Sequence, residues 1–155
     1  MNSRVEESQL RLFDSVNLGV AVALHHGLVV PVIRGADSLT LSQVSAAIHD
    51  LAERARNNKL IPDDYRGGTF TVSNLGMCRI REFVAIINPP QAGSRALGEA
   101  APRAIVRHGT LCAAPIMTAT LSADHRAVDG VAAARFLVVI RESLETPEQL
   151  LGAGE

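Results

Sequence analysis

The sequence predicts an α+β fold in which helices pack on a mixed β-sheet. Short apolar runs of strand length recur along the chain, and two longer stretches repeat their apolar residues with helical spacing. These elements follow one another as strands, helix, several strands and helix, an order that favours a mixed sheet covered by helices. With 155 residues, 47% of them apolar and 20% charged, the chain has the size and composition of one globular domain.

The first strands are expected to form a hairpin of buried strands. Residues 16–24 and 28–34 are apolar runs, and the two histidines and the glycine between them are typical of a turn. Pro31 has no amide hydrogen to donate to a strand ladder, so it should lie at an edge, an end or a bulge.

Two helices are predicted by their periodicity and by the residues at their ends. The first extends from Thr40 to about Asn58, and Thr40 and Gln43 have the spacing of a capping box. The second follows residues 124–130, and Pro147 marks its end or a short new turn. After a loop at 61–68, the remaining strands are expected at 69–76 (ending in a turn), 83–88, 94–98, 104–107 and 115–123, with a hairpin turn at 108–109.

Charge and hydropathy exclude several classes of protein. The formal net charge is −1 and no basic face stands out, which argues against nucleic acid as a partner. The longest apolar runs are too short to span a membrane, and the polar, mixed-charge segment 1–15 is not a signal peptide. The two cysteines lie far apart in sequence, have no metal-ligand spacing, and fit reduced thiols in a cytoplasmic protein.

The segment LSADHRAVDG at 121–130 is the most informative part of the sequence for chemistry. It places His125 just after a strand, where a short polar loop can present a side chain rigidly. Asp129 lies at the expected N-terminus of the last helix, where it can cap the helix or pair with a nearby arginine. A neutral imidazole accepts a proton near neutral pH, so His125 is a candidate general base. A histidine in this position can also simply pack between strand and helix.

Ser73, in the segment TFTVSNLG at 69–76, is the second candidate. It lies beside Asn74 where the strand becomes a turn. Its hydroxyl can donate to a developing oxyanion, or it can cap the turn by bonding to the backbone. The other histidines, in two expected turns and on the polar side of the first helix, have no spacing that closes a metal site.

These two segments, together with NLGVAVAL…GLVVPVIR and AIINPPQA, resemble the catalytic domain of the dihydrolipoamide acyltransferases, the core components of 2-oxo acid dehydrogenase complexes. The resemblance extends from about Val16 to the last helix. The family belongs with chloramphenicol acetyltransferase, whose related signature begins His-His. Here Asp124 precedes His125 and Arg126 follows it, which favours the dihydrolipoamide branch. The resemblance implies a chloramphenicol acetyltransferase-like mixed β-sheet sandwich with helices packed on the sheet.

The resemblance also implies a reaction, in which an acyl group moves between dihydrolipoamide and coenzyme A. His125 matches the base that takes the proton from a thiol, and Ser73 matches the hydroxyl that bonds the oxyanion of the tetrahedral intermediate. Asp129 matches the acidic residue that keeps the active-site loop in shape. Asn74 and Arg126, which flank the two catalytic positions, are expected to contact substrate. Such a transfer between thiols needs no metal.

The same resemblance implies partners. In this family the base and the oxyanion donor come from different subunits of a homotrimer, and trimers build a hollow 24-mer or 60-mer core. The lipoyl group is a substrate carried on a separate lipoyl domain, and the decarboxylase and dihydrolipoamide dehydrogenase components bind the same complex. The expected location is the cytoplasm, or the mitochondrial matrix in a eukaryote.

The chain also departs from the family pattern. Residues 1–15 match it poorly, and the catalytic domain expected over residues 16–155 is incomplete at its N-terminal side. Arg79 and Arg95 carry charge where the family is usually small or apolar, and an Arg95 within a strand must face solvent or find a partner.

Two other functions are therefore weighed against acyl transfer. One is a catalytically silent structural or assembly fragment of the complex core. The other is an acetyltransferase that acts on a small hydroxyl compound, and both Arg126 and the segment at 69–76 count against it.

Overall fold

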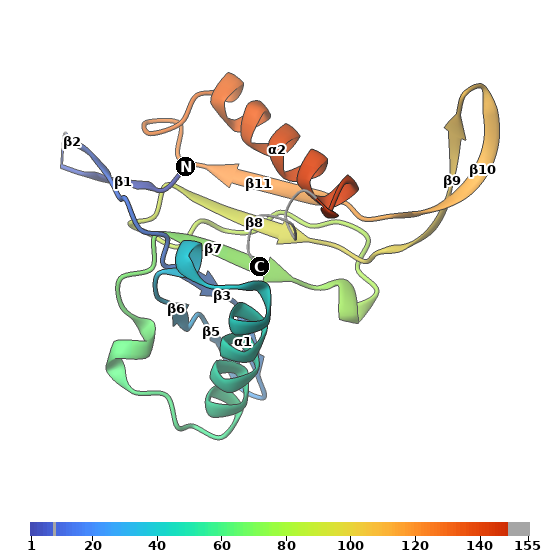
Figure 1. Cartoon of the computed structure of the whole chain (residues 1–155). Coiled ribbons are helices and arrows are strands. Elements are labelled where there is room, and N and C mark those ends of the chain that lie inside the picture. The colour runs from blue at the N-terminus through green and yellow to red at the C-terminus, as the bar shows by residue number, and fades with distance from the viewer. Residues whose placement is uncertain (8, 149–155) are drawn as a thin grey trace.

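A five-stranded mixed sheet forms the centre of the computed structural model, which describes residues 1–7 and 9–148 (Figure 1). Its strand order is β11-β8-β7-β3-β6. Strand β7 runs parallel to β3 and β8, whereas the outer strands β6 and β11 are antiparallel to their neighbours. The five strands are β3 (Leu18–Val20), β6 (Val32–Ile33), β7 (Phe70–Asn74), β8 (Gly93–Leu97) and β11 (Ala119–Ala123). This mixed sheet, with helices beside it, confirms the predicted α+β class.

Helices α1 (Leu41–Arg56) and α2 (Gly130–Glu145) pack against this core, and Figure 1 shows α2 lying along β11. The predicted capping box of α1 is confirmed: Gln43 N donates to Thr40 Oγ1 at 3.3 Å, and Thr40 N donates to Gln43 Oε1 at 2.8 Å. The Phe136 ring of α2 meets Phe70 of β7 edge-on, with ring centroids 5.8 Å apart. No helix in residues 1–7 and 9–148 is long and apolar enough to cross a membrane.

The hairpin predicted in the first part of the chain is confirmed. Strand β4 (Val22–Leu24) pairs antiparallel with β5 (Gly27–Val29), and the chain turns at residues 25–26. Pro31 lies between β5 and β6, at a strand end as expected. The expectation that both strands are buried is wrong for β5, where Leu28 is 64% exposed, because this hairpin extends beyond the five-stranded sheet.

A long hairpin projects from the sheet before the last strand (Figure 1). It joins β9 (Ala101–Arg107) to β10 (Thr110–Ile116) and turns at residues 108–109 as predicted, with positive φ angles of 52° and 78°. The single strand expected at 115–123 is divided between β10 and β11, because the chain leaves the hairpin and enters the sheet at 117–118.

The N-terminal segment also forms a hairpin, for which its polar sequence gives no strand prediction. Strand β1 (Ser3–Glu6) pairs antiparallel with β2 (Gln9–Leu12). Ala92 N donates to Ser3 O at 2.9 Å, so this hairpin is attached beside the start of β8. The short 3-10 helices η1 (Ala36–Ser38), η2 (Pro62–Tyr65) and η3 (Gly76–Cys78) complete the described structure.

Residues 83–88 are not the strand that their apolar composition predicts. Their carbonyls accept hydrogen bonds from side chains of β11 in place of a backbone ladder. Thr120 Oγ1 donates to Phe83 O at 2.5 Å, and Ser122 of the same strand donates to the carbonyl two residues further on, also at 2.5 Å. The segment therefore lies against one face of the sheet, and Ile86 is 92% exposed on its outer side.

Arg95 contradicts the expectation that a charged residue in a strand faces solvent or finds a partner. It lies in β8, an interior strand, and is only 8% exposed. Its Nε is buried and has no hydrogen-bond partner within the part of the chain that the structure describes. The burial follows from its position, because Arg95 lies at the middle of β8 beside side chains of α2 and Ala119 of β11.

Candidate active site

His125 lies in a tight turn between β11 and α2. Asp124 N donates to Ala92 O at 2.8 Å, and Asp124 O accepts from Ala127 N and Val128 N at 2.9 and 3.0 Å. Val128 is 6% exposed and anchors the loop in the core, whereas the side chain of His125 is exposed. The loop backbone is thus well held while the imidazole is presented at the surface.

An ion pair between Asp124 and Arg126 closes the loop around His125. Arg126 Nε donates to Asp124 Oδ1 at 3.0 Å, and Arg126 Nη2 donates to Asp124 Oδ2 at 2.6 Å. The Arg126 backbone N–H also donates to Asp124 Oδ1 at 3.0 Å. These charge-assisted bonds, first those of the guanidinium and then that of the backbone, lower the pKa of Asp124 to about 2. They also raise the pKa of Arg126.

Asp124 is the loop residue that reasoning from the sequence missed. The arginine near His125 was expected to be available to Asp129, but it pairs with the carboxylate two residues before it. The signal was present in the sequence as an acidic and a basic residue on either side of the histidine. Arg126, expected to contact substrate, remains 72% exposed on its side chain despite the pairing.

Asp129 begins helix α2. Its Oδ1 accepts a hydrogen bond from Ala132 N at 2.7 Å, and its backbone is extended as an N-cap requires. The capping role expected for Asp129 is confirmed by this bond. The cap fixes the residue at which the helix begins. It therefore also restrains the end of the loop that carries His125.

Ser73 is the penultimate residue of β7. Its side chain is half-buried, and Asn74 follows it at the end of the strand. Asn74 Oδ1 accepts from Gly76 N at 2.8 Å, so the turn after the strand is capped by Asn74. Gly76 is required in this turn, because an added Cβ would lie 2.8 Å from the carbonyl oxygen of Gly98. Of the two roles weighed for Ser73, turn capping is thus filled by its neighbour.

The structure does not bring Ser73 and His125 together within one chain. Ser73 is level with Ala96 of β8, whereas His125 follows Ala123, which is paired with Gly93 at the opposite end of β8. The two positions are separated by at least about 10 Å along the strands and by two strand spacings of about 4.8 Å each. Within one chain the candidate site is therefore divided into two half-sites, with Ser73 at one end of the sheet and His125 at the other.

Neither half-site lines either of two cavities in the described part of the chain. One cavity, of about 550 Å³, lies under the second half of α2, and another, of about 400 Å³, lies beside the turn of the β4–β5 hairpin. Within residues 1–7 and 9–148, no group of three or more histidine, cysteine or acidic side chains is placed to hold a metal ion. The candidate chemistry therefore rests on an exposed His125 and a half-buried Ser73 at opposite ends of the sheet.

Comparison with known proteins identifies the family. Residues 1–152 match the family model described as 2-oxoacid dehydrogenases acyltransferase (catalytic domain). A curated relative from Rickettsia bellii, the dihydrolipoyllysine-residue acetyltransferase component of pyruvate dehydrogenase complex, is 43% identical over 97% of this chain. The chain spans only 36% of that relative's length.

Solved structures agree in fold. The dihydrolipoamide acetyltransferase of Azotobacter vinelandii has a TM-score of 0.92 and 34% identity, covering 97% of this chain and 63% of the solved one. The cubic core of the pyruvate dehydrogenase multienzyme complex has the same score, identity and coverage. The family match and these two structures lead to one conclusion: the chain belongs to the 2-oxoacid dehydrogenase acyltransferases and matches the model of their catalytic domain over residues 1–152.

Proposed function

We propose that the chain transfers an acyl group between dihydrolipoamide and coenzyme A, with His125 as general base and Ser73 as oxyanion donor. One observation carries the proposal. The Azotobacter vinelandii enzyme was investigated for the role of a serine, a histidine and an asparagine in its catalytic mechanism. The intervals between those three residues, 52 and 4 positions, equal the intervals between Ser73, His125 and Asp129.

The chemistry follows from these groups. His125 takes the proton of one thiol, and the resulting thiolate attacks the carbonyl carbon of the other partner's thioester. Ser73 donates a hydrogen bond to the oxyanion of the tetrahedral intermediate. The intermediate then expels the second sulfur as a thiolate, which takes the proton that His125 removed from the first thiol. General-base catalysis contributes about 10²–10⁴-fold and one oxyanion donor about 10²–10³-fold.

The third residue of this set is Asp129, whereas the solved relative has an asparagine at the corresponding interval. Asp129 can perform the same local task, because aspartate and asparagine are both strong N-caps and its bond to Ala132 N is in place. Asp129 is thus a positioning residue for the loop. Arg126, exposed beside His125, and Asn74, beside Ser73, are the proposed substrate contacts.

The separation of the half-sites supports a site built by two copies of the chain. His125 of one copy meets Ser73 of another, with the two thiols between them, in a homotrimer. The likeness to a cubic multienzyme core supports further assembly of the trimers, in a 24-mer, and the alternative is a 60-mer. A lipoyl domain, the decarboxylase and dihydrolipoamide dehydrogenase are the partners that this function requires. The cytoplasm, or the matrix of a mitochondrion, remains the predicted location.

The direct test is a thiol-acyl transfer assay with free dihydrolipoamide and acetyl-, succinyl- or isobutyryl-coenzyme A. His125→Ala should abolish transfer, while His26→Ala should leave it unchanged, because His26 is an exposed residue in the turn of the β4–β5 hairpin and has no role in the proposed reaction. Equal turnover in wild type and His125→Ala would exclude the mechanism. Absence of transfer in the wild-type chain would favour the silent structural fragment instead.

A further inference from the structure

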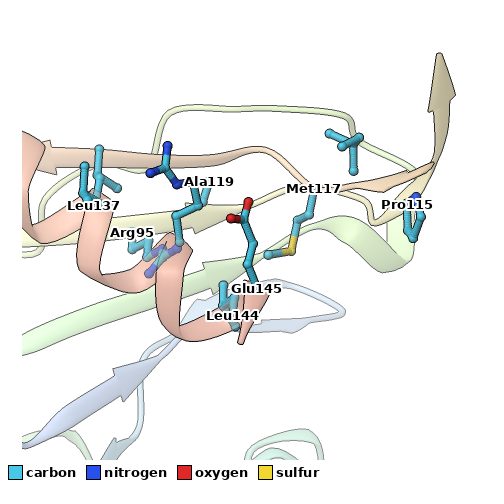
Figure 2. A pocket seen from close by; sticks show the side chains of 10 residues that line it. Arg95, Pro115, Met117, Ala119, Leu137, Leu144 and Glu145 are labelled. Atoms are coloured by element: carbon cyan, nitrogen blue, oxygen red, sulfur yellow. The ribbon is translucent and has the colours of Figure 1, made fainter. Parts of the chain in front are cut away.

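The cavity under α2 is lined by residues that have no role in the proposed acyl transfer. It measures about 550 Å³ and lies between the second half of α2 and the strands β8 and β11. Figure 2 shows Leu144 and Glu145 at the end of the helix, with Met117 extending toward them from the opposite side. Leu137, Met117 and Leu144 give it an apolar lining, and Arg95, Arg141 and Glu145 supply its charges.

Arg95 is the unusual member of this lining. It is more than nine-tenths buried, and its Nε has no hydrogen-bond partner among the described residues. Burial lowers the pKa of this guanidinium, which means that the cation is poorly solvated where it stands. A buried cation without a counter-ion is costly, so an anion that enters the cavity gains from neutralising it.

The other charged residues of the lining do not neutralise Arg95. Arg141 and Arg95 are cationic and Glu145 is anionic, so the lining carries one excess positive charge. Among the described residues, Arg141 pairs with Glu142, with Nη2 and Oε1 3.9 Å apart and both side chains exposed. Glu145 forms no ion pair with Arg95 among the described residues, although both line the cavity (Figure 2).

We propose that this cavity binds a small amphipathic carboxylate, with its anionic end on Arg95 and its hydrocarbon against Met117, Leu137 and Leu144. The volume lies within the range of about 300–1,000 Å³ that is usual for small-molecule sites, which combine an apolar lining with a few polar groups. A guanidinium is also well suited in shape to a carboxylate.

This site is separate from the acyl-transfer half-sites. Arg95 is level with Val72 and Leu121, so it lies on the α2 face of the sheet, whereas Ser73 is level with Ala96 and faces the other way. His125 lies beyond the far end of β11. Ligand binding here and transfer activity can therefore be measured and lost independently.

The experiment is a calorimetric titration of the full chain with sodium octanoate, with 1-octanol as the uncharged ligand of equal chain length. Octanoate should bind saturably and more tightly than octanol. Arg95→Met should weaken octanoate by about tenfold, the loss expected for one charge-assisted bond, and should leave octanol unchanged. Arg56→Met, an arginine of the other cavity, is the matched control and should bind octanoate as the wild type does.

A second variant guards against misfolding of the first. Ala119→Leu leaves Arg95 in place but fills part of the cavity, and it should also weaken octanoate; thermal melting by circular dichroism checks that both variants are folded. Equal octanoate affinity in wild type and in a folded Arg95→Met would overturn the proposal. Self-association that depends on Arg95, seen by light scattering without octanoate binding, would also overturn it and assign the anion to a second copy of the chain.

Discussion

Asp124 and Arg126 form a bidentate ion pair across the turn that presents His125, with Nε–Oδ1 and Nη2–Oδ2 distances of 3.0 and 2.6 Å. The histidine between them is exposed and is therefore positioned by its loop. The two flanking charges, the Asp129 cap and the buried Val128 are the contacts that restrain this loop.

Breaking the ion pair should lower turnover more than it lowers stability. In Asp124→Asn the bidentate partner of Arg126 is lost, the loop gains freedom, and kcat for acyl transfer should fall about tenfold or more because general-base geometry is sensitive to small displacements. The melting temperature should change little, since the pair is at the surface. The kcat and melting temperature of Asp124→Asn, measured beside those of Glu142→Gln as an exposed control, check this. A loss of stability without loss of kcat contradicts the positioning role.

The same pair predicts an acid transition of the loop. The pKa of Asp124 is lowered in the folded chain from 3.8 to about 2, so the carboxylate stabilises the folded loop above pH 3.8. That contribution is lost as the pH falls from about 4 toward 2. An NMR titration of the Arg126 Nε–H signal should show a transition in this window. The transition should be absent in Asp124→Asn; a transition that persists in this variant rules out Asp124 as its origin.

Loss of the Asp129 cap should lower the stability of the fold. Replacement by alanine removes the bond to Ala132 N and should lower the free energy of unfolding by about 1 kcal/mol, measured by urea denaturation. Asp129→Asn should keep most of that free energy, because asparagine caps nearly as well. If the alanine variant unfolds at the wild-type urea concentration, the cap does not contribute to stability.

Ser73→Ala separates oxyanion stabilisation from substrate binding. The hydrogen bond forms mainly in the transition state, so kcat should fall about 10²–10³-fold while KM changes little. Asn74→Ala is an informative comparison, because it removes the turn cap to Gly76 N and should reduce stability as well as activity. A large rise in KM alone in Ser73→Ala would point to substrate binding.

The sequence was most informative where a periodic pattern and a local chemical signal agreed. The capping box of Thr40 and Gln43 and the apolar spacing of α1 point to one helix, and the structure contains it. The turn at 108–109 was equally clear, because a glycine followed a residue that tolerates positive φ.

Prediction failed where the outcome depended on contacts distant in sequence. The apolar composition of 83–88 resembles a strand, but Thr120 and Ser122 of β11 occupy its carbonyls. The burial of Arg95 depends on the packing of α2 and β11 side chains around it, which no local pattern encodes. For the candidate site, the sequence predicts roles for His125, Ser73 and Asp129 but not the ion pair between Asp124 and Arg126, because acidic residues on both sides of Arg126 in the sequence could have been its partner.

The central claim is that His125 of one copy acts with Ser73 of another, and co-expression of His125→Ala with Ser73→Ala tests it most directly. Each variant alone should be nearly inactive. In mixed trimers, about a quarter of the interfaces should combine an intact His125 with an intact Ser73, so activity should return to about a quarter of the wild-type value. Mixed trimers that show only the average of the two single variants would contradict a site shared between subunits.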